Sequence, residues 1–276
     1  DKIGLAVNST EARELHRSGK KVAMIGVENA YPLGLDISRV KEFYDRGARY
    51  MSLSHNGHSQ FCDSNTGEKD SLWIDKGVSN LGKQVIEEMN KLGMMIDISH
   101  PSKQSIKDMI SLSKAPIIAS HSSARALCNH SRNLDDEQLE WMKSNGGVVQ
   151  TVAFSSYVNS EKHIAYSSAL SKKVENLARE REMEMKSWDE IRKLEAADRE
   201  IYVKQYRVMS KEAAKSMNES DPKPVDVADY VDHIDYLVEK IGLDHVGISS
   251  DFDGGGGIYG WNDASETLNV TAELLK

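Results

Sequence analysis

The chain has 276 residues, of which 39% are hydrophobic and 28% are charged, and its formal net charge is −8. This composition is typical of a globular protein and excludes a disordered chain. No apolar run reaches the ~20 residues that a membrane-spanning helix needs, and the negative charge argues against a nucleic-acid partner. The two cysteines, Cys62 and Cys128, are too few for a disulfide framework, and both one bridge and two free thiols stay open.

Short apolar runs alternate with segments of helical periodicity along the chain. This pattern predicts strands at residues 21–28, 49–55, 94–100, 115–121, 148–154 and 244–250. It predicts helices at residues 9–18, 36–47, 80–92, 103–114, 134–145, 225–240 and 267–276. Strands and helices that alternate in this way indicate an α/β fold with a parallel sheet, either doubly wound or closed into a barrel.

Six strands are too few to close the usual eight-stranded barrel, so a barrel would need two strands from outside this sequence. The chain also begins with Asp1 instead of Met, and it stops within the last expected helix. We therefore expect a single, incomplete domain over residues 1–276, an α/β (β/α)8 TIM-type barrel of which about six strands are present.

A highly charged segment without glycine, at about residues 158–222, interrupts this pattern. Its content of Glu, Lys, Arg, Ala and Met predicts two long helices, which Pro222 and Pro224 end. We interpret the segment as a solvated helical insertion before the last strand. A partner-binding arm is the alternative interpretation. We further expect the segment to lie over the catalytic edge of the sheet, as a lid.

Acidic residues and histidines stand at the ends of five of the six expected strands, namely Glu28, His55, His100, His121 and Asp251. Parallel sheets and barrels carry their active sites at the carboxyl ends of the strands. A single histidine at a strand end is more often structural, but the set together predicts a metal site. Carboxylate and imidazole ligands suit zinc, and also manganese, cobalt or iron.

Other polar residues near these strand ends are less specific. Arg132 suits a substrate carboxylate, although the residues alone favour a solvated loop arginine. Asp253, two residues after Asp251, is expected to cap or hold the glycine-rich loop 254–257, which lacks the Gly-Lys-Ser/Thr of a nucleotide site. His58 is an additional candidate ligand, with a solvated loop histidine as the alternative.

Five segments in this order resemble the renal (membrane) dipeptidase family of zinc metallopeptidases, which have amidohydrolase-type barrels. They are GVENAY around Glu28, RYMSLSH ending at His55, MIDISH ending at His100, PIIASHSSARALCNHSRN with His121 and Arg132, and DHIDYLVEKIGLDHVGISSDFDG from Asp232 to Gly254. The resemblance covers nearly the whole chain except the charged insertion. It implies hydrolysis of dipeptides, L,L and L,D, by a metal-bound hydroxide.

The resemblance also implies a role for each matching residue. Glu28 corresponds to the glutamate that bridges two zinc ions, and His100 and His121 to the histidines of the second zinc. His55 corresponds to a histidine that contacts substrate and stabilises the oxyanion. Arg132 corresponds to the arginine that holds the substrate carboxylate, and Asp251 to the aspartate that takes a proton and contacts the amino end.

One feature of the family is absent from this sequence. The family carries a His-x-Asp pair on its first strand as ligands of the first zinc, whereas only His16 precedes Glu28 here. We expect a truncated chain whose half-built site holds one metal weakly or none. The open sheet edges of such a chain would favour association.

Alternatives to a dipeptidase stay open at this stage. They are another binuclear-metal amidohydrolase, such as a lactonase or deaminase, and a binding protein that has lost its metal site. A homodimer is a further expectation from the family. The sequence leaves the cellular location undetermined, with a periplasmic or extracellular location favoured over a cytoplasmic one.

Overall fold

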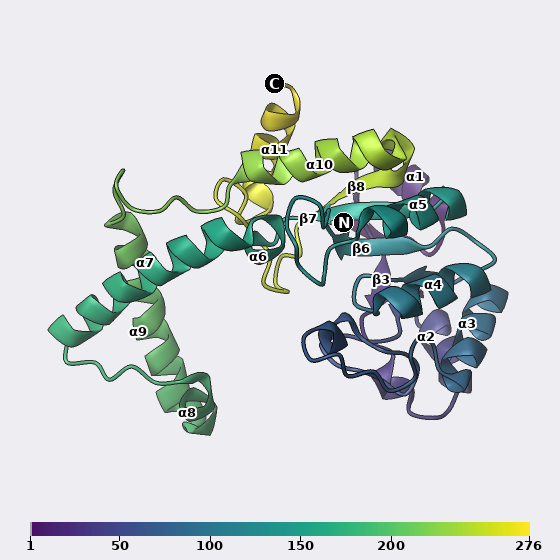
Figure 1. The fold of residues 1–276 in the computed structure, drawn as a ribbon, viewed down its shortest axis with the longest axis horizontal. Helices are drawn as coiled ribbons and strands as arrows, with labels where there is room; N and C mark the ends of the chain where they lie inside the picture. The colour runs from purple at the N-terminus through teal and green to yellow at the C-terminus, as the bar shows by residue number, and fades with distance from the viewer. Residues whose placement is uncertain (1) are drawn as a thin grey trace.

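The computed structural model describes residues 2–276 and is built on a six-stranded parallel sheet (Figure 1). The strands lie in the order in which they follow along the chain: β3 (Ile25–Val27), β4 (Ala48–Ser52), β5 (Met95–Asp97), β6 (Ile118–Ser122), β7 (Val148–Val152) and β8 (Val246–Ser249). A doubly wound sheet reverses its strand order at a switch point. This sheet does not, so its topology is that of a TIM-type barrel, and within the described residues the barrel is not closed.

Helices connect the strands and cover the sheet: α2 (Ser38–Asp45), α3 (Asn80–Leu92), α4 (Lys103–Leu112), α5 (Asp136–Asn145) and α10 (Val227–Ile241). Their ends follow local sequence signals. Ser79 and Ser102 accept hydrogen bonds at the starts of α3 and α4, Asp135 forms a capping box at α5, and α3 ends at Gly93 in the left-handed conformation. The main core lies between these helices and the sheet and includes Met51, Ile96, Met109, Leu139 and Leu237.

The expected strand 21–28 is divided in the structure. Residues Lys21–Ala23 form β2, which pairs with β1 (Ile3–Leu5) in a separate two-stranded sheet, and only β3 joins the main sheet. The helix α1 (Ser9–Arg17) connects β1 to β2. The chain turns at Met24 because the two halves of the run pair with partners in different sheets.

The charged insertion forms an arm of three helices instead of the expected two: α7 (Ser160–Glu180), α8 (Trp188–Lys193) and α9 (Ala196–Lys215). Helices α7 and α9 pack through a small core of Val174, Ala178, Met209 and Ala213. At the base of the arm, Lys162 pairs with Asp226 and Asp229. The arm extends away from the sheet, on the side opposite α3 and α4 (Figure 1).

The remaining elements are short. They are α6 (Ser155–Val158), α11 (Thr267–Leu274) and the 3-10 helices η1 (Tyr31–Leu33), η2 (Asn65–Glu68), η3 (Leu243–His245) and η4 (Ala264–Glu266). Cys62 and Cys128 are both buried free thiols, so the alternative of a bridge between them is wrong. Among the helices of residues 2–276, none combines the length and the apolar character needed to cross a membrane.

Gly82, in the first turn of α3, has no side chain, which lets the backbone of Phe61 lie close against this helix. A Cβ at this position would meet the carbonyl oxygen of Phe61. We therefore expect Gly82→Ala to lower the free energy of unfolding by about 1–3 kcal/mol through overpacking, although the same change in a solvated helix is stabilising by roughly 0.5–1 kcal/mol. Urea denaturation measures the difference. The exposed neighbour provides the control, since Lys83→Ala should change stability by less than about 0.5 kcal/mol; equal stability of the two variants would contradict this packing.

Candidate metal centre

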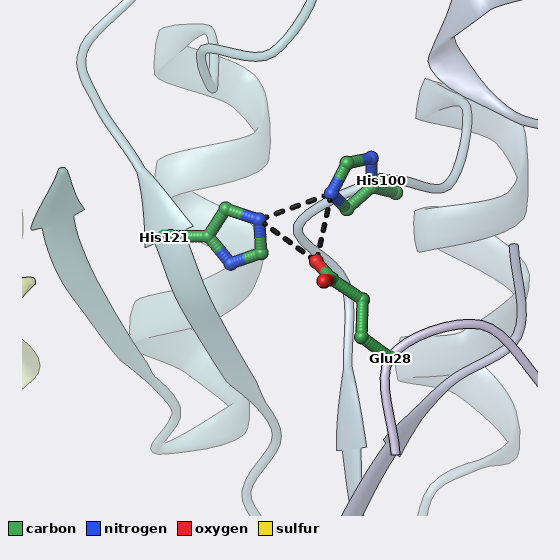
Figure 2. A group of neighbouring side chains, drawn as sticks. All are labelled: Glu28, His100 and His121. Carbon is green, nitrogen blue, oxygen red and sulfur yellow. Dashed lines mark hydrogen bonds and ion pairs between the residues drawn. The ribbon is translucent and has the colours of Figure 1, made fainter. Parts of the chain in front are cut away.

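Three side chains from different strands converge at the carboxyl edge of the sheet. Glu28 follows β3, His100 follows β5 and His121 lies in β6, and Figure 2 shows both imidazole rings turned toward the carboxylate. The two Nε2 atoms are 3.0 Å apart, and they lie 3.1 Å (His100) and 3.2 Å (His121) from Oε1 of Glu28. Parallel strands end at the same edge, so residues distant in sequence meet there.

The geometry of this cluster fits one metal ion. Three donor atoms bound to one zinc at ~2.0–2.2 Å lie roughly 3–3.5 Å from one another, and the three distances here agree with that spacing. Nη2 of Arg132 lies 3.2 Å from Nε2 of His100. A guanidinium can only donate, so Nε2 of His100 presents a lone pair. A cluster of lone pairs at this distance is repulsive unless a cation lies among them.

The electrostatic environment keeps these groups in the states that bind a metal. Burial lowers the pKa of His100 to about 4, an effect that the adjacent Glu28 opposes and the charge of Arg132 reinforces. His100 is therefore neutral near pH 7. The adjacent imidazoles of His100 and His121 hold the pKa of Glu28 well below its ordinary value, so Glu28 is a carboxylate.

His55 lies at the solvent side of the cluster. Its ring centroid is 4.2 Å from that of His100, and its Nε2 is 3.9 Å from Oε1 of Glu28. The side chain is 36% exposed, whereas that of His100 is 5% exposed. His55 therefore lies on the exposed side of the cluster, and it is not one of the three converging donors.

Arg132 is buried, so the interpretation as a solvated loop arginine is wrong. The guanidinium donates to the carbonyl oxygens of Ser99 and His121 and lies over the ring of Tyr157, with Cζ 5.4 Å from its centroid. These partners come from other elements, which a local pattern cannot reveal. Burial lowers the pKa of Arg132 from its ordinary high value. Arg132 is in contact with the metal cluster through His100.

Asp251 follows β8 and lines a cavity of about 290 Å³ together with Glu28, His121 and Tyr50. Burial raises the pKa of this carboxyl. The glycine loop is held by Asp251, whose carbonyl oxygen accepts from the backbone of Gly254 and Gly256. The expectation that Asp253 holds this loop is wrong, because its side chain accepts no hydrogen bond from any described residue.

Three polar residues next to the cluster were missed by the sequence analysis: Asp97, Ser99 and Ser120. Asp97 accepts hydrogen bonds from both serine hydroxyls, and Ser120 Oγ is 2.8 Å from Nδ1 of His121. The sequence does contain a signal for the two serines, because each of the predicted strands 94–100 and 115–121 ends in Ser-His. By contrast, His58 lies outside the cluster and contacts Asp63.

The whole chain, residues 1–276, matches the membrane dipeptidase family, peptidase family M19. The chain belongs to this family. This match confirms the resemblance to the membrane dipeptidases, and Glu28, His100 and His121 form a cluster that could hold a metal ion. Within the described residues, the helical arm of α7, α8 and α9 contributes no side chain to the cavity that Asp251 and Glu28 line.

Curated relatives and solved structures agree with this assignment. Dipeptidase tcpJ of Claviceps purpurea is 29% identical over 100% of this chain and 50% of its own length, and dipeptidase verJ of Clonostachys rogersoniana is 31% identical over 100% and 55%. The chain thus spans about half the length of these relatives. The probable dipeptidase PvdM of Pseudomonas aeruginosa has a TM-score of 0.74 and 35% identity, covering 99% of this chain and 68% of that one.

A more distant structure supports the fold alone. It is a metallo peptidase of Rhodobacter sphaeroides, solved with a phosphinate mimic of the dipeptide L-Ala-D-Ala, with a TM-score of 0.70 and 20% identity over 99% of this chain and 62% of that one.

Removal of one donor atom tests the cluster directly. We expect His121→Ala to weaken zinc binding to the metal-depleted protein by at least about tenfold, because one of three converging ligands is lost. Isothermal titration calorimetry measures the affinity. His58→Ala is the matched control and should bind as the unmodified protein does, since His58 lies outside the cluster. Unchanged affinity in His121→Ala would refute this ligand set.

Proposed function

We propose that this chain carries the catalytic site of a zinc-dependent dipeptidase that hydrolyses the peptide bond of L,L and L,D dipeptides. The observation that carries the proposal is the convergence of Glu28, His100 and His121 in a member of the membrane dipeptidase family. Two nitrogen donors and one carboxylate oxygen are a typical ligand set for zinc. The curated dipeptidases among the relatives support the choice of a dipeptide substrate.

Glu28, His100 and His121 would hold the metal. Both imidazoles contact Oε1 of Glu28, so these three residues together would hold one metal ion. A bound zinc ion would activate water near neutral pH and polarise the carbonyl of the scissile bond. The remaining steps fall to His55, Arg132 and Asp251.

His55 would stabilise the developing oxyanion. It lies on the exposed side of the cluster, beside His100 and Glu28. A hydrogen bond to the oxyanion in the transition state contributes on the order of 3 kcal/mol where such donors have been removed by mutation. Because the ring is held close to the ligands, this donor needs little reorganisation during the reaction.

Asp251 would carry the proton to the leaving amine. It lines the same cavity as Glu28 and His121. Burial raises its pKa, which favours temporary protonation of the carboxyl. The same carboxylate can contact the amino end of the substrate once the proton has been transferred.

Arg132 would bind the free carboxylate of the dipeptide. Its guanidinium is fixed beside His100 by the carbonyl groups of Ser99 and His121, and its Nε is buried without a partner among the described residues. With Arg132 binding the carboxylate and Asp251 contacting the amino end, the pair would suit a zwitterionic substrate of two residues. This pair distinguishes a dipeptidase from a lactonase or deaminase on the same fold.

The role of Glu28 as a metal ligand is tested by Glu28→Gln in the intact, zinc-loaded protein. We expect the loss of nearly all hydrolysis of a panel of L,L and L,D dipeptides, because a neutral amide is a much weaker metal ligand than a carboxylate. Ninhydrin detection of the released amino acids measures the rate. Lys83→Ala, on the exposed face of α3, is the control. Failure of the unmodified zinc-loaded protein to cleave any dipeptide would refute the proposed function, and full activity of Glu28→Gln would refute the ligand role.

The role of Arg132 is tested with substrates that differ only at the carboxyl end. We expect the unmodified protein to prefer Ala-Ala over Ala-Ala amide, and Arg132→Lys to raise KM for Ala-Ala by about 10–100-fold with a smaller effect on the amide. Lysine keeps the charge but loses the paired hydrogen bonds. Equal changes in KM for both substrates would indicate a structural role alone.

A further inference from the structure

Asp97 is a buried carboxylate with only neutral hydrogen-bond donors around it. It is 1% exposed and stands at the carboxyl end of β5. Its Oδ1 accepts from Ser99 N (3.0 Å), Ser99 Oγ (2.7 Å) and Ser120 N (3.1 Å), and its Oδ2 accepts from Ser120 Oγ (2.5 Å). No ion pair with Asp97 occurs within residues 2–276. A carboxylate is costly to bury without a counter-charge, so its retention here calls for an explanation.

The hydrogen bonds around Ser120 determine where the proton of His121 lies. Ser120 has one hydroxyl hydrogen and three neighbours: Oδ2 of Asp97 at 2.5 Å, Nδ1 of His121 at 2.8 Å and Oγ of Ser99 at 3.2 Å, of which the carboxylate is the nearest and strongest acceptor. A carboxylate can only accept, so the hydroxyl donates to Asp97 and accepts from His121. His121 therefore carries its proton on Nδ1, and its Nε2 presents a lone pair to the cluster.

The same carboxylate also shapes the backbone that carries His121. The register of β6 shifts between Ala119 and Ser122, which is where Ser120 and His121 lie. The backbone N–H of Ser120 donates to Asp97, and that of His121 donates to Ser99 Oγ at 3.0 Å. The irregularity lies in the pairing of β6 with β7, and on the β5 side these two side chains accept from the backbone of β6. Such irregularities commonly turn a side chain toward a site.

We propose that Asp97 is a positioning residue that acts through Ser120 to hold His121 in the Nδ1-protonated tautomer, with Nε2 directed at the metal. The inference rests on the metal site of the proposed function. His100 provides a contrast, because its Nδ1 is buried without a hydrogen-bond partner in the described part of the chain. Only one of the two histidines is thus oriented by a hydrogen-bonded network.

Asp97→Asn tests the proposal because the new amide has one predictable orientation. Three donors face Oδ1, so the amide oxygen takes that position and the NH2 group faces Ser120. Ser120 then accepts from the amide and donates to Nδ1 of His121, which moves the imidazole proton to Nε2. We expect the zinc affinity of the intact protein to fall about 10–100-fold.

The tautomer itself is read by 15N NMR of the metal-depleted protein, with the His121 signals assigned from His121→Gln. We expect Nδ1–H in the unmodified protein and Nε2–H in Asp97→Asn. Ser120→Ala removes only the hydroxyl that connects Asp97 to His121. It should abolish the preference of His121 for the Nδ1–H tautomer and lower the zinc affinity by less than Asp97→Asn does. Ser122→Ala is the matched control, since Ser122 is a buried serine of the same strand whose hydroxyl has no partner in the structure.

The outcomes separate this inference from the proposed function. A shifted tautomer with weakened zinc binding supports it even in a protein that cleaves no dipeptide. A folded Asp97→Asn variant with an unchanged tautomer would overturn it, whatever its zinc affinity, because Asp97 would then be structural only. Should Asp97→Asn not fold, an Nδ1–H tautomer retained in Ser120→Ala would overturn it equally.

Discussion

The centre of this structure depends on one electrostatic constraint, which is that three electron-pair donors face one another at 3.0–3.2 Å. Such an arrangement is unfavourable without a cation and favourable with one. Oε1 of Glu28, Nε2 of His100 and Nε2 of His121 are brought together by three strands of a parallel sheet. Burial, which lowers the pKa of His100, and the neighbouring Arg132 keep this histidine neutral and therefore able to bind metal.

The surroundings of the cluster divide into an exposed side and a buried side. His55 stands on the exposed side, Asp251 lines the adjacent cavity, and Arg132 is fixed beside His100 by backbone carbonyl groups. On the buried side, Asp97 and its two serines orient His121. This member of the membrane dipeptidase family thus combines a rigid set of candidate ligands with an accessible face.

The sequence predicted the fold well where the signal is local. The six main strands, and the helix from Asn80 to Leu92 with Gly93 at its end, follow from apolar runs and capping residues. The division of residues 21–28 at Met24 could not be predicted, since it depends on pairing with β1 and β4. The third helix of the arm had a readable signal, the capping box from Ser187 to Glu190.

The site was predictable in its ligands but less so in its supports. Glu28, His100 and His121 stand at strand ends, where type and position together suggest a metal. The burial of Arg132 depends on the carbonyl groups of Ser99 and His121, and the role of Asp97 depends on strand β6, so neither is visible in a local pattern.

The most direct measurement of the central claim is anomalous diffraction at the zinc edge from crystals of the intact, zinc-loaded protein. We predict an anomalous peak about 2.0–2.2 Å from Oε1 of Glu28, Nε2 of His100 and Nε2 of His121. A zinc-loaded crystal with no peak among these three atoms would contradict the account.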